Sequence, residues 1–371
     1  MTIVVTIIAF IVIFSILILV HEWGHFAAAR RAGIHVEEFG IGLPPRAKAI
    51  YKDKKGTVYS LNWIPFGGYV RLRGEDSSDP AALHDKQSFA GKSLPARMAV
   101  VVAGVFMNFV LAWVLVTVGF TLGMRPFLIT DQDYKVAMER GLIQTREVLM
   151  VHEVSPDSPA AKAGLQANDI ISQLNGQPAP DSDHFGKSLK PGKANPLVVV
   201  HDGKEQKLEV TPNADGKIGV AISTEQFVER VKEARYPFYI ASIKAAEEVA
   251  RLSLLTVKML GKVVTTLVSQ RTIPEGVAGP VGIAKMTHTF VQQGAMAVMQ
   301  FMALISISLG VLNIMPFPAL DGGRLIFLVF ELFIRRRPSP KLEGIVHGVG
   351  FGLLILLIFV VTWNDIVHLI K

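Results

Sequence analysis

The sequence contains no cysteine and few charged side chains for its length. Among its 371 residues there is no Cys, and Asp, Glu, Lys and Arg together make up 19%. The lack of cysteine excludes disulfide bonds and thiolate metal ligands, so any metal must be held by His, Asp or Glu. Low charge, 50% hydrophobic residues and a mean hydropathy of +0.39 exclude an ordinary soluble enzyme. The composition therefore favours an integral membrane protein.

The positive charge of the chain does not indicate nucleic acid as a partner. The formal net charge is +7, yet no basic cluster with interleaved aromatic residues is present. Lys and Arg beside membrane spans explain this excess better, because they are enriched in cytoplasmic loops. The expected surroundings are a lipid bilayer, and we expect no nucleic acid.

Four apolar runs are long enough to cross a bilayer. The first, Ile3 to Val20, lacks a basic segment before it and is too long for a signal peptide, so we expect it to be retained. The others are Met98 to Leu122, Ala297 to Ile314 and roughly Gly344 to Trp363. Four spans place both ends of the chain on one side of the membrane.

Short basic connections predict the orientation of these spans. The loops between the first and second spans and between the third and fourth are rich in cations, which favours the cytoplasmic side: Arg30, Arg31, Arg46, Lys48, Lys86, Lys92, Arg97, Arg335, Arg336, Arg337 and Lys341. The N-terminus, the segment from Gly123 to about Gly294 and the C-terminal Lys371 are then predicted outside.

The motif His21-Glu22-Trp23-Gly24-His25 follows directly on the first apolar run. In a helix, His21 and His25 project from one face and can share a metal ion, and Glu22 can act on a metal-bound water. Ionisable groups at membrane depth are costly and usually functional. The motif therefore predicts a metallopeptidase site in or against the bilayer.

A third metal ligand is expected at the end of the third span. The first and third spans run in the same direction, so Asp321, in the segment from Asn313 to Gly323, can reach the two histidines. Two histidines and one carboxylate leave an open position for water, as catalytic zinc sites do. Such ligands also suit other divalent ions, and Asp321 could instead be a helix-terminal or turn residue.

Two further stretches, together with these motifs, carry a resemblance to a known family. They are GPVGIAK at 279–285 and an insert with the pattern of a PDZ domain between the second and third spans. With HEWGH at 21–25 and NIMPFPALDGG at 313–323, the chain resembles the site-2 proteases, peptidase family M50. It is most similar to their regulator of sigma E protease branch, in a form with one PDZ domain rather than two. It departs from the common Gly-Pro of the second span by having Gly104-Val105.

This resemblance implies an intramembrane zinc metalloprotease that takes part in regulated intramembrane proteolysis and the sigma-E stress response. It would cut single-span membrane proteins of the anti-sigma-factor type in or near their transmembrane segment, after another protease has trimmed them. The expected location is the bacterial inner membrane, with one Zn²⁺ per chain. Glu22 is the expected general base. His21, His25 and Asp321 are the expected metal ligands, and the expected substrate-contacting residues are Asn313, Pro316, Pro318 and Asn108.

Asn313 and Asn108 also have plainer interpretations. Asn313 could cap the third span rather than contact the substrate backbone or a developing oxyanion. Asn108 could bond a neighbouring helix, or support the site from behind the ligands.

The predicted fold class is a four-span helical membrane protein with a membrane-associated β-hairpin and one inserted PDZ-like α/β domain. The expected segments are the first span (1–32), a cytoplasmic or re-entrant β region (33–97), the second span (98–122), the extracytoplasmic PDZ-like domain (123–224, core about 146–224), an amphipathic helix with a connector (225–296), the third span with its motif (297–323), a basic cytoplasmic loop (324–343), and the fourth span with the C-terminus (344–371).

Three local interpretations depend on pattern alone. Residues 33–74 alternate like strands around a Lys55-Gly56 turn, which fits either a re-entrant element that pairs with an unwound substrate or an ordinary hairpin. Residues 225–270 have helical periodicity and too many charges for a fifth span, which predicts an amphipathic surface helix. The PDZ-like insert could bind extended peptides or act as a size filter, and its ligand is left open.

Two other functions fit parts of the pattern. A metal transporter or channel could use the same three ligands, although no internal repeat is evident and the ionisable residues gather at one face. An inactive membrane scaffold with a PDZ domain is disfavoured because every expected ligand and the base are present.

Overall fold

The chain forms two compact units. The computed structural model describes residues 2–75, 81–201, 203–270 and 277–370. One unit comprises 1–124 and 235–371, and the other comprises 125–234. The predicted extracytoplasmic position of Lys371 falls outside the described residues, as does part of the predicted connector, 271–276.

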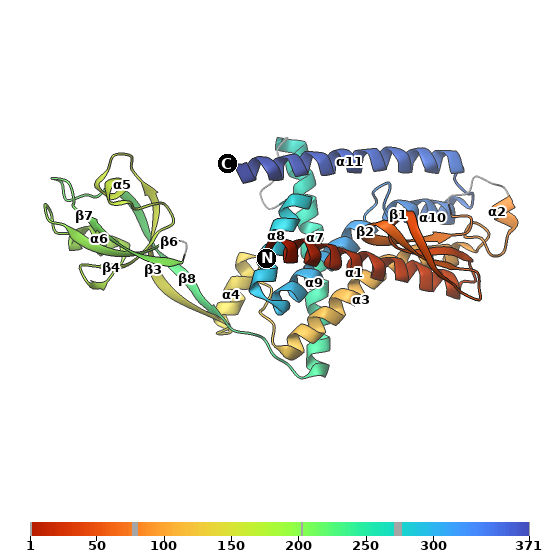
Figure 1. Ribbon diagram of the computed structural model, residues 1–371, viewed down its shortest axis with the longest axis horizontal. Helices are drawn as coiled ribbons and strands as arrows, with labels where there is room; N and C mark the ends of the chain where they lie inside the picture. Colours follow the sequence, from red (N-terminus) through yellow and green to blue (C-terminus); the bar gives the residue numbers. More distant parts are fainter. Residues whose placement is uncertain (1, 76–80, 202, 271–276, 371) are drawn as a thin grey trace. The chain divides into compact units, whose positions relative to one another are not determined.

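Among the described residues, four helices of the first unit are long and apolar enough to cross a membrane. They are α1 (Thr2–Arg31), α3 (Leu94–Leu122), α9 (Ala295–Ile314) and α11 (Pro340–Ile370). Helix α3 packs against both α1 and α9 (Figure 1). The four predicted spans are therefore present as helices, and α3 continues unbroken past Gly104-Val105.

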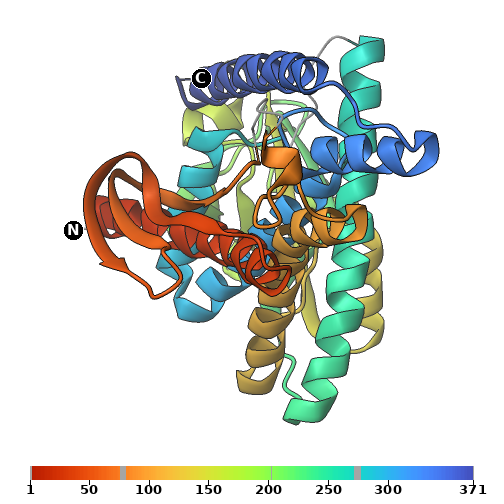
Figure 2. The same cartoon turned by 90° about the vertical axis from the view of Figure 1, so that its right-hand side faces the viewer.

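Beside α1 lies a β-sheet element made of β1 (Val36–Lys52) and β2 (Val58–Leu72), as Figure 2 shows. The predicted hairpin turn at Lys55-Gly56 joins them. Glu38 of β1 stands opposite both Val58 and Arg71 of β2. The start of β1 therefore lies between two segments of β2, which makes the element wider than a simple hairpin.

A buried carboxylate sits at the centre of this element. The side chain of Glu38 is 2% exposed, and it accepts hydrogen bonds from Arg46, Ser60 (2.6 Å) and Tyr69. Burial by itself raises the pKa of Glu38, but these donors outweigh burial and hold the pKa at about 2, below its ordinary 4.5. The ionised carboxylate thus ties β1 to both segments of β2.

This depressed pKa predicts a pH dependence of stability. The contribution of Glu38 is fully present above pH 4.5 and is lost as the pH falls towards about 2. Within that window, one proton taken up on unfolding changes the unfolding constant by up to about tenfold per pH unit. Glu38→Gln should be less stable at neutral pH and show a flatter profile between pH 5 and 2, as measured by thermal unfolding in detergent. A profile as steep as that of the wild type would contradict the assignment.

The residues that the structure describes in the first unit form four further helices: α2 (Ala81–His84), α7 (Phe238–Gln270), α8 (Pro280–Gln293) and α10 (Asp321–Ile334). Figure 1 shows α7 crossing the direction of α1 and α11. Its buried residues, Ala241, Ala245, Val249 and Leu252, follow one face of the helix, and α7 packs on α3. The apolar residues Ile243, Leu254 and Val257 are exposed on another face, 53–65%.

Two predicted boundaries are wrong in detail. Residues 225–231, expected in the amphipathic helix, belong to strand β8, because they pair with residues 143–148 far away in the sequence. Backbone pairing across the sheet overrides the local helical pattern there. Most of the basic connection expected as a loop at 324–343 is helix α10, which ends at Ile334.

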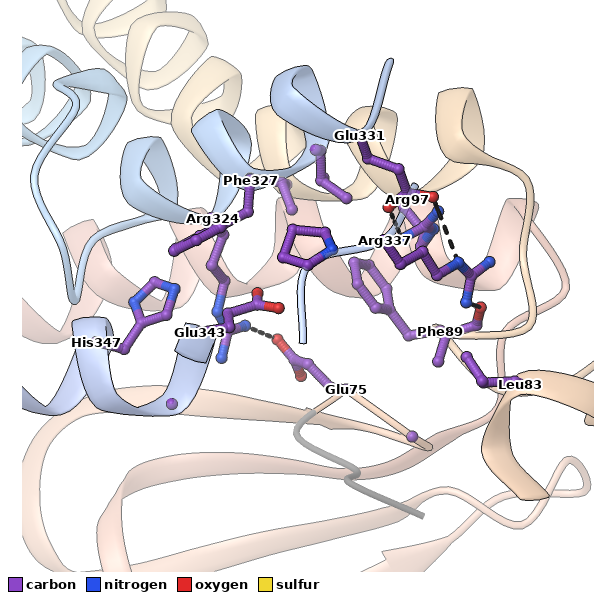
Figure 3. A pocket seen from close by; sticks show the side chains of 16 residues that line it. Glu75, Leu83, Phe89, Arg97, Arg324, Phe327, Glu331, Arg337, Glu343 and His347 are labelled. Carbon is purple, nitrogen blue, oxygen red and sulfur yellow. Dashed lines mark hydrogen bonds and ion pairs between the residues drawn. The ribbon is translucent and has the colours of Figure 1, made fainter. Parts of the chain in front are cut away.

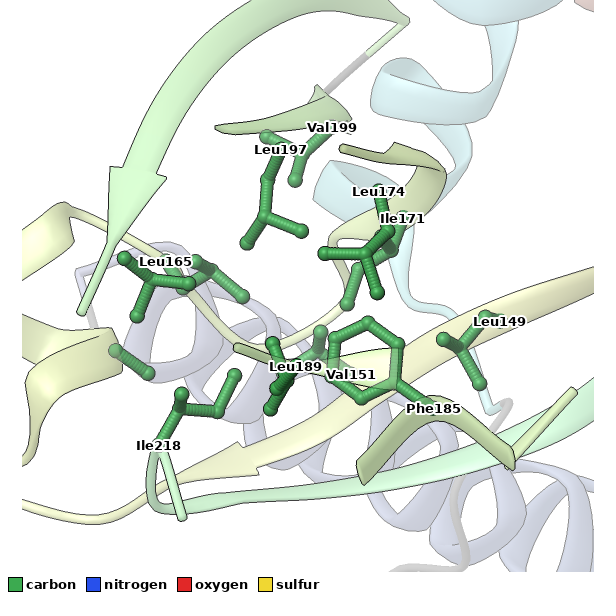
Figure 4. Close-up of a cluster of buried hydrophobic side chains, with 12 residues drawn as sticks. Leu149, Val151, Leu165, Ile171, Leu174, Phe185, Leu189, Leu197, Val199 and Ile218 are labelled. Atoms are coloured by element: carbon green, nitrogen blue, oxygen red, sulfur yellow. The ribbon is translucent and has the colours of Figure 1, made fainter. Parts of the chain in front are cut away.

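The second unit is built on one antiparallel sheet. Its strands are β3 (Ile143–Val154), β4 (Ile170–Leu174), β5 (Gln177–Pro178), β6 (Asn195–His201), β7 (Lys204–Val210) and β8 (Val220–Val231), in the order β7-β6-β4-β3-β8 with β5 beside β4. The helices are α4 (Asp131–Glu139), α5 (Pro159–Ala163) and α6 (Ser182–Ser188). Figure 4 shows its core, in which Phe185 of α6 packs among Leu149, Val151 and Ile171.

Candidate metal centre

His21, His25 and Asp321 come together within the first unit. The Nε2 atoms of the two histidines lie 3.1 Å apart, and Oδ2 of Asp321 lies 3.0 Å from Nε2 of His21 and 3.3 Å from Nε2 of His25. Their side chains are 11%, 12% and 18% exposed. In the part of the chain that the structure describes, no other three His, Asp or Glu side chains gather in this way.

Helices α1 and α10 carry the three side chains of this group. The histidines lie one turn apart on α1, and Asp321 is the first residue of α10, seven residues after the last residue of α9. Because Asp321 reaches the C-terminal half of α1, the C-terminal ends of α1 and α9 lie at the same end of the bundle. This agrees with the sequence-based expectation that the first and third spans run in the same direction.

Close approach of α1 and α3 depends on two glycines. A Cβ atom on Gly24 would lie 2.4 Å from the carbonyl oxygen of Ala103, and one on Gly104 would lie 2.2 Å from Nε2 of His25. Neither distance is possible without movement of the backbone or of the imidazole. Gly104 therefore leaves the space that the His25 ring fills.

Hydrogen bonds on the far side of each imidazole fix its orientation. Nδ1 of His25 lies 2.9 Å from the carbonyl oxygen of Val100. A carbonyl can only accept, so Nδ1 carries the proton, and the Nε2 lone pair faces the Asp321 carboxylate. Nδ1 of His21 lies 3.3 Å from the side-chain amide of Asn108, which is fully buried.

Glu22 stands beside the three-residue group without joining it. Its Oε2 accepts a hydrogen bond of 3.0 Å from the backbone N–H of Val70 in β2. This bond sets the carboxylate next to the histidines and places the last segment of β2 along the functional part of α1. A carboxylate held beside a potential metal site, but outside the ligand set, is in the position that a general base needs.

A cavity of about 250 Å³ opens onto this group. Its lining includes His21, Glu22, Asn108, Asn313 and Asp321, together with the apolar residues Leu17, Ile18, Leu309, Ala319 and Leu320. Asn313, near the end of α9, thus shares one cavity with the predicted base and with two of the predicted ligands, His21 and Asp321. The lining does not include Pro316 or Pro318, so those two predicted substrate contacts are not brought to the cavity.

Pro318 instead takes part in holding the loop that carries Asp321. It lies against Gly350 of α11, where an added Cβ would come within 2.2 Å of it. The next residue, Ala319, has a left-handed φ of 77°, and its N–H donates a 3.0 Å hydrogen bond to Nδ1 of His347 in α11. Helix α11 therefore supports the conformation of the Asp321 loop from outside.

Paired charges hold α10 in place at a second cavity of about 250 Å³ (Figure 3). Arg97 of α3 donates to both carboxylate oxygens of Glu331, and the two side chains are 7% and 13% exposed. Arg324 pairs with Glu75, which follows β2. Since α10 begins with Asp321, these ion pairs anchor the helix that carries the third predicted ligand.

The donor atoms fit a zinc ion. Two ligand atoms bound to tetrahedral zinc at about 2.0–2.1 Å lie about 3.3 Å apart. The three distances among Nε2, Nε2 and Oδ2 are 3.0, 3.1 and 3.3 Å. Among the described residues, the buried Oδ2 of Asp321 has no hydrogen-bond partner, and the Nε2 atoms of the two imidazoles lie 3.0 and 3.3 Å from it. Two neutral imidazoles and one carboxylate facing one point are a donor set that zinc accepts.

Backbone groups and glycines were the part of the site that sequence reasoning missed. The roles of the Val70 N–H and the Val100 carbonyl have no sequence signature, since backbone N–H and carbonyl groups recur along the whole chain. Gly104 had a signal, because glycine in an apolar span often marks close helix packing. His347 lies in the fourth span, and an ionisable residue at such a position is itself a sign of function or of a specific partner.

The chain is similar to known proteins over nearly its whole length. Residues 9–357 match the profile of peptidase family M50. The zinc metalloprotease RasP of Oceanobacillus iheyensis is 30% identical over 449 aligned positions, which cover 98% of this chain and 99% of the relative. The regulator of sigma E protease of Haemophilus influenzae is 29% identical over 443 positions, covering 97% and 98%. A relative from Clostridium perfringens is 34% identical over 360 positions, covering 95% and 96%.

The helices and the His-His-Asp group define a membrane protein with a metallopeptidase-type site. With the match over nearly its whole length, the chain belongs to peptidase family M50, a family of intramembrane zinc metalloproteases. The resemblance drawn from its motifs is therefore confirmed.

Proposed function

We propose that the chain hydrolyses a peptide bond in or near the transmembrane segment of single-span membrane proteins, with one zinc ion held by His21, His25 and Asp321. The observation that carries this proposal is the geometry of the three donor atoms, 3.0–3.3 Å apart at the end of apolar helices. When zinc is bound, it lowers the pKa of a coordinated water and polarises the scissile carbonyl.

Glu22 is the proposed general base. Its carboxylate takes the proton of the attacking water and returns it to the leaving amine. The Val70 N–H holds one carboxylate oxygen, which leaves the other to face the cavity. Extended substrate is required, because the backbone hydrogen bonds of a helix shield its peptide bonds. The nearby β2 segment offers a strand edge to which such a substrate can pair.

Asn313 is the proposed contact for the substrate carbonyl or the oxyanion that forms on it. Removing one donor of this kind lowers kcat by about 10²–10³-fold. We expect Asn313→Ala to show a loss of that size, with zinc content unchanged and KM little altered, in steady-state cleavage of a model substrate. A rise in KM at constant kcat would assign Asn313 to ordinary substrate binding instead.

The second unit is proposed to be a single PDZ-like domain outside the cytoplasm. Its support is the antiparallel order β7-β6-β4-β3-β8 with helices α5 and α6, and its open edges β7 and β8 allow addition of a peptide strand. Alignment with the Oceanobacillus relative has 449 positions against 371 residues in this chain, so at least 78 positions have no counterpart here. That difference fits the absence of a second such domain.

For the membrane topology, we propose cytoplasmic connections between α1 and α3 and between α9 and α11, following the basic residues there. Helix α7 is proposed to lie in the plane of the membrane, because it crosses the direction of α1 and α11 and exposes Ile243, Leu254 and Val257. By likeness to proteins named regulator of sigma E protease, the proposed location is a bacterial inner membrane and the proposed substrates are anti-sigma-factor-like.

The test of this function is cleavage of a short single-span substrate by the purified protein in liposomes. Fragments whose new ends map to the apolar segment or its border would support it. Intact substrate after incubation with the zinc-loaded protein, for several different substrates, would contradict it.

A further inference from the structure

The side-chain amide of Asn108 lies behind His21, on the side of the imidazole away from Asp321. Asn108 is 0% exposed on α3, and its own backbone carbonyl accepts a 2.7 Å hydrogen bond from Ser306 of α9. Its amide nitrogen is placed 3.3 Å from Nδ1 of His21, and its Oδ1 is buried without a hydrogen-bond donor among the described residues. Asn108 thus contacts α9 through its backbone carbonyl and α1 through its side-chain amide.

Metal binding imposes a particular tautomer on His21. If Nε2 gives its lone pair to a metal, the single proton of the neutral imidazole must sit on Nδ1, which then needs an acceptor. His25 has such an acceptor in the carbonyl of Val100. For His21, the group at that position is the amide of Asn108.

A single change of orientation of the Asn108 amide gives its Oδ1 a hydrogen-bond donor and gives Nδ1 of His21 an acceptor. A protonated Nδ1 facing the amide nitrogen would set two donors against each other, while Oδ1 stays unsatisfied. Rotating the amide by 180° keeps its shape and turns Oδ1 toward Nδ1–H, so the two donors no longer face each other and the oxygen gains a donor. Asn108 is also among the residues that line the cavity of about 250 Å³ beside His21 and Asp321.

We propose that Asn108 is a positioning residue that accepts a hydrogen bond from Nδ1–H of His21 and so holds the imidazole in the metal-binding tautomer. This inference rests on the metal site of the proposed function. It assigns the buried asparagine to the support of a ligand rather than to contact with substrate. Partners that orient a ligating histidine typically contribute about 10–100-fold to metal affinity.

The test is the zinc affinity of the purified full chain, measured by competition with a chromophoric chelator. Asn108→Leu keeps the approximate size and removes the acceptor, so its affinity should fall about 10–100-fold. Asn108→Asp keeps an acceptor of the same shape and should bind zinc at least as tightly as the wild type. Ser306→Ala removes the bond to the backbone of Asn108 but leaves the amide in place, so it controls for disturbed packing and should not change the affinity.

Thermal unfolding without zinc shows whether each variant is folded, and Asn108→Ala, with the same expected loss, replaces the leucine variant if that one is not. Wild-type affinity in the folded Leu or Ala variant, or an Asp variant as weak as the Leu variant, would overturn the inference. His25→Ala distinguishes failure of the Asn108 inference from failure of the proposed metal site. If His25→Ala binds zinc like the wild type, the assignment of the metal site is wrong, and the proposed role of Asn108 is wrong as well.

Discussion

Glu22→Gln should abolish cleavage and leave the zinc content of the protein unchanged. Gln has the size of Glu, and its oxygen can still accept the 3.0 Å hydrogen bond from Val70, so the local structure is kept. It cannot take a proton from water at neutral pH. General acid–base groups typically contribute 10²–10⁴-fold, and Glu22 has both proton transfers, so we expect a loss of at least about 10³-fold. Zinc per chain and initial cleavage rates on the same sample measure both quantities.

The control for this variant is Glu37→Gln, which removes the charge of an exposed carboxylate on β1. We expect it to retain the wild-type rate. If Glu22→Gln loses zinc in proportion to its loss of activity, Glu22 is part of the metal site or its scaffold, and the assignment as base is wrong.

Gly104→Ala should lose zinc and activity together. The added Cβ would lie 2.2 Å from Nε2 of His25 and 2.5 Å from its Cε1, closer than atoms can approach. The imidazole must leave its place, and it then also loses its bond to Val100. Because zinc with two remaining protein ligands is held far more weakly, we expect the affinity to fall at least about 100-fold.

The matched variant for this test is Gly352→Ala, on α11. A Cβ there meets no atom within 4 Å, so zinc affinity should match that of the wild type. Chelator competition on both proteins gives the comparison. Zinc affinity of Gly104→Ala equal to that of Gly352→Ala would show that His25 is not held against α3 as described.

The features that could be predicted from the sequence are those that depend on residues close together in the chain. Hydropathy runs give the four spans, and the spacing of His21 and His25 gives one helical face. The parallel direction of the first and third spans brings Asp321 to that face before any coordinates are known. The distances of 3.0–3.3 Å among the three donors were not predictable, because they depend on close packing of α1 on α3.

What could not be predicted depends on long-range contacts. Strand β8 takes residues 225–231 out of a helical pattern because β3 supplies a partner about 80 residues away. Pro316 and Pro318 share a motif with Asn313, yet only Asn313 lines the cavity, because helix α9 ends at Ile314, between Asn313 and the two prolines. The connection expected as a loop after Gly323 becomes α10, which Arg97 and Glu75 anchor through Glu331 and Arg324.

The most direct test of the central claim is zinc-dependent cleavage in liposomes that contain only this protein and a single-span substrate. Zinc is removed with a chelator and restored in steps up to one ion per chain, while fragments are mapped by mass spectrometry and zinc flux across the bilayer is followed in parallel. We expect cleavage in or beside the apolar segment to disappear with the metal and to return with the first equivalent of zinc, without zinc flux. Zinc flux with intact substrate, or cleavage that persists without metal, would contradict the claim.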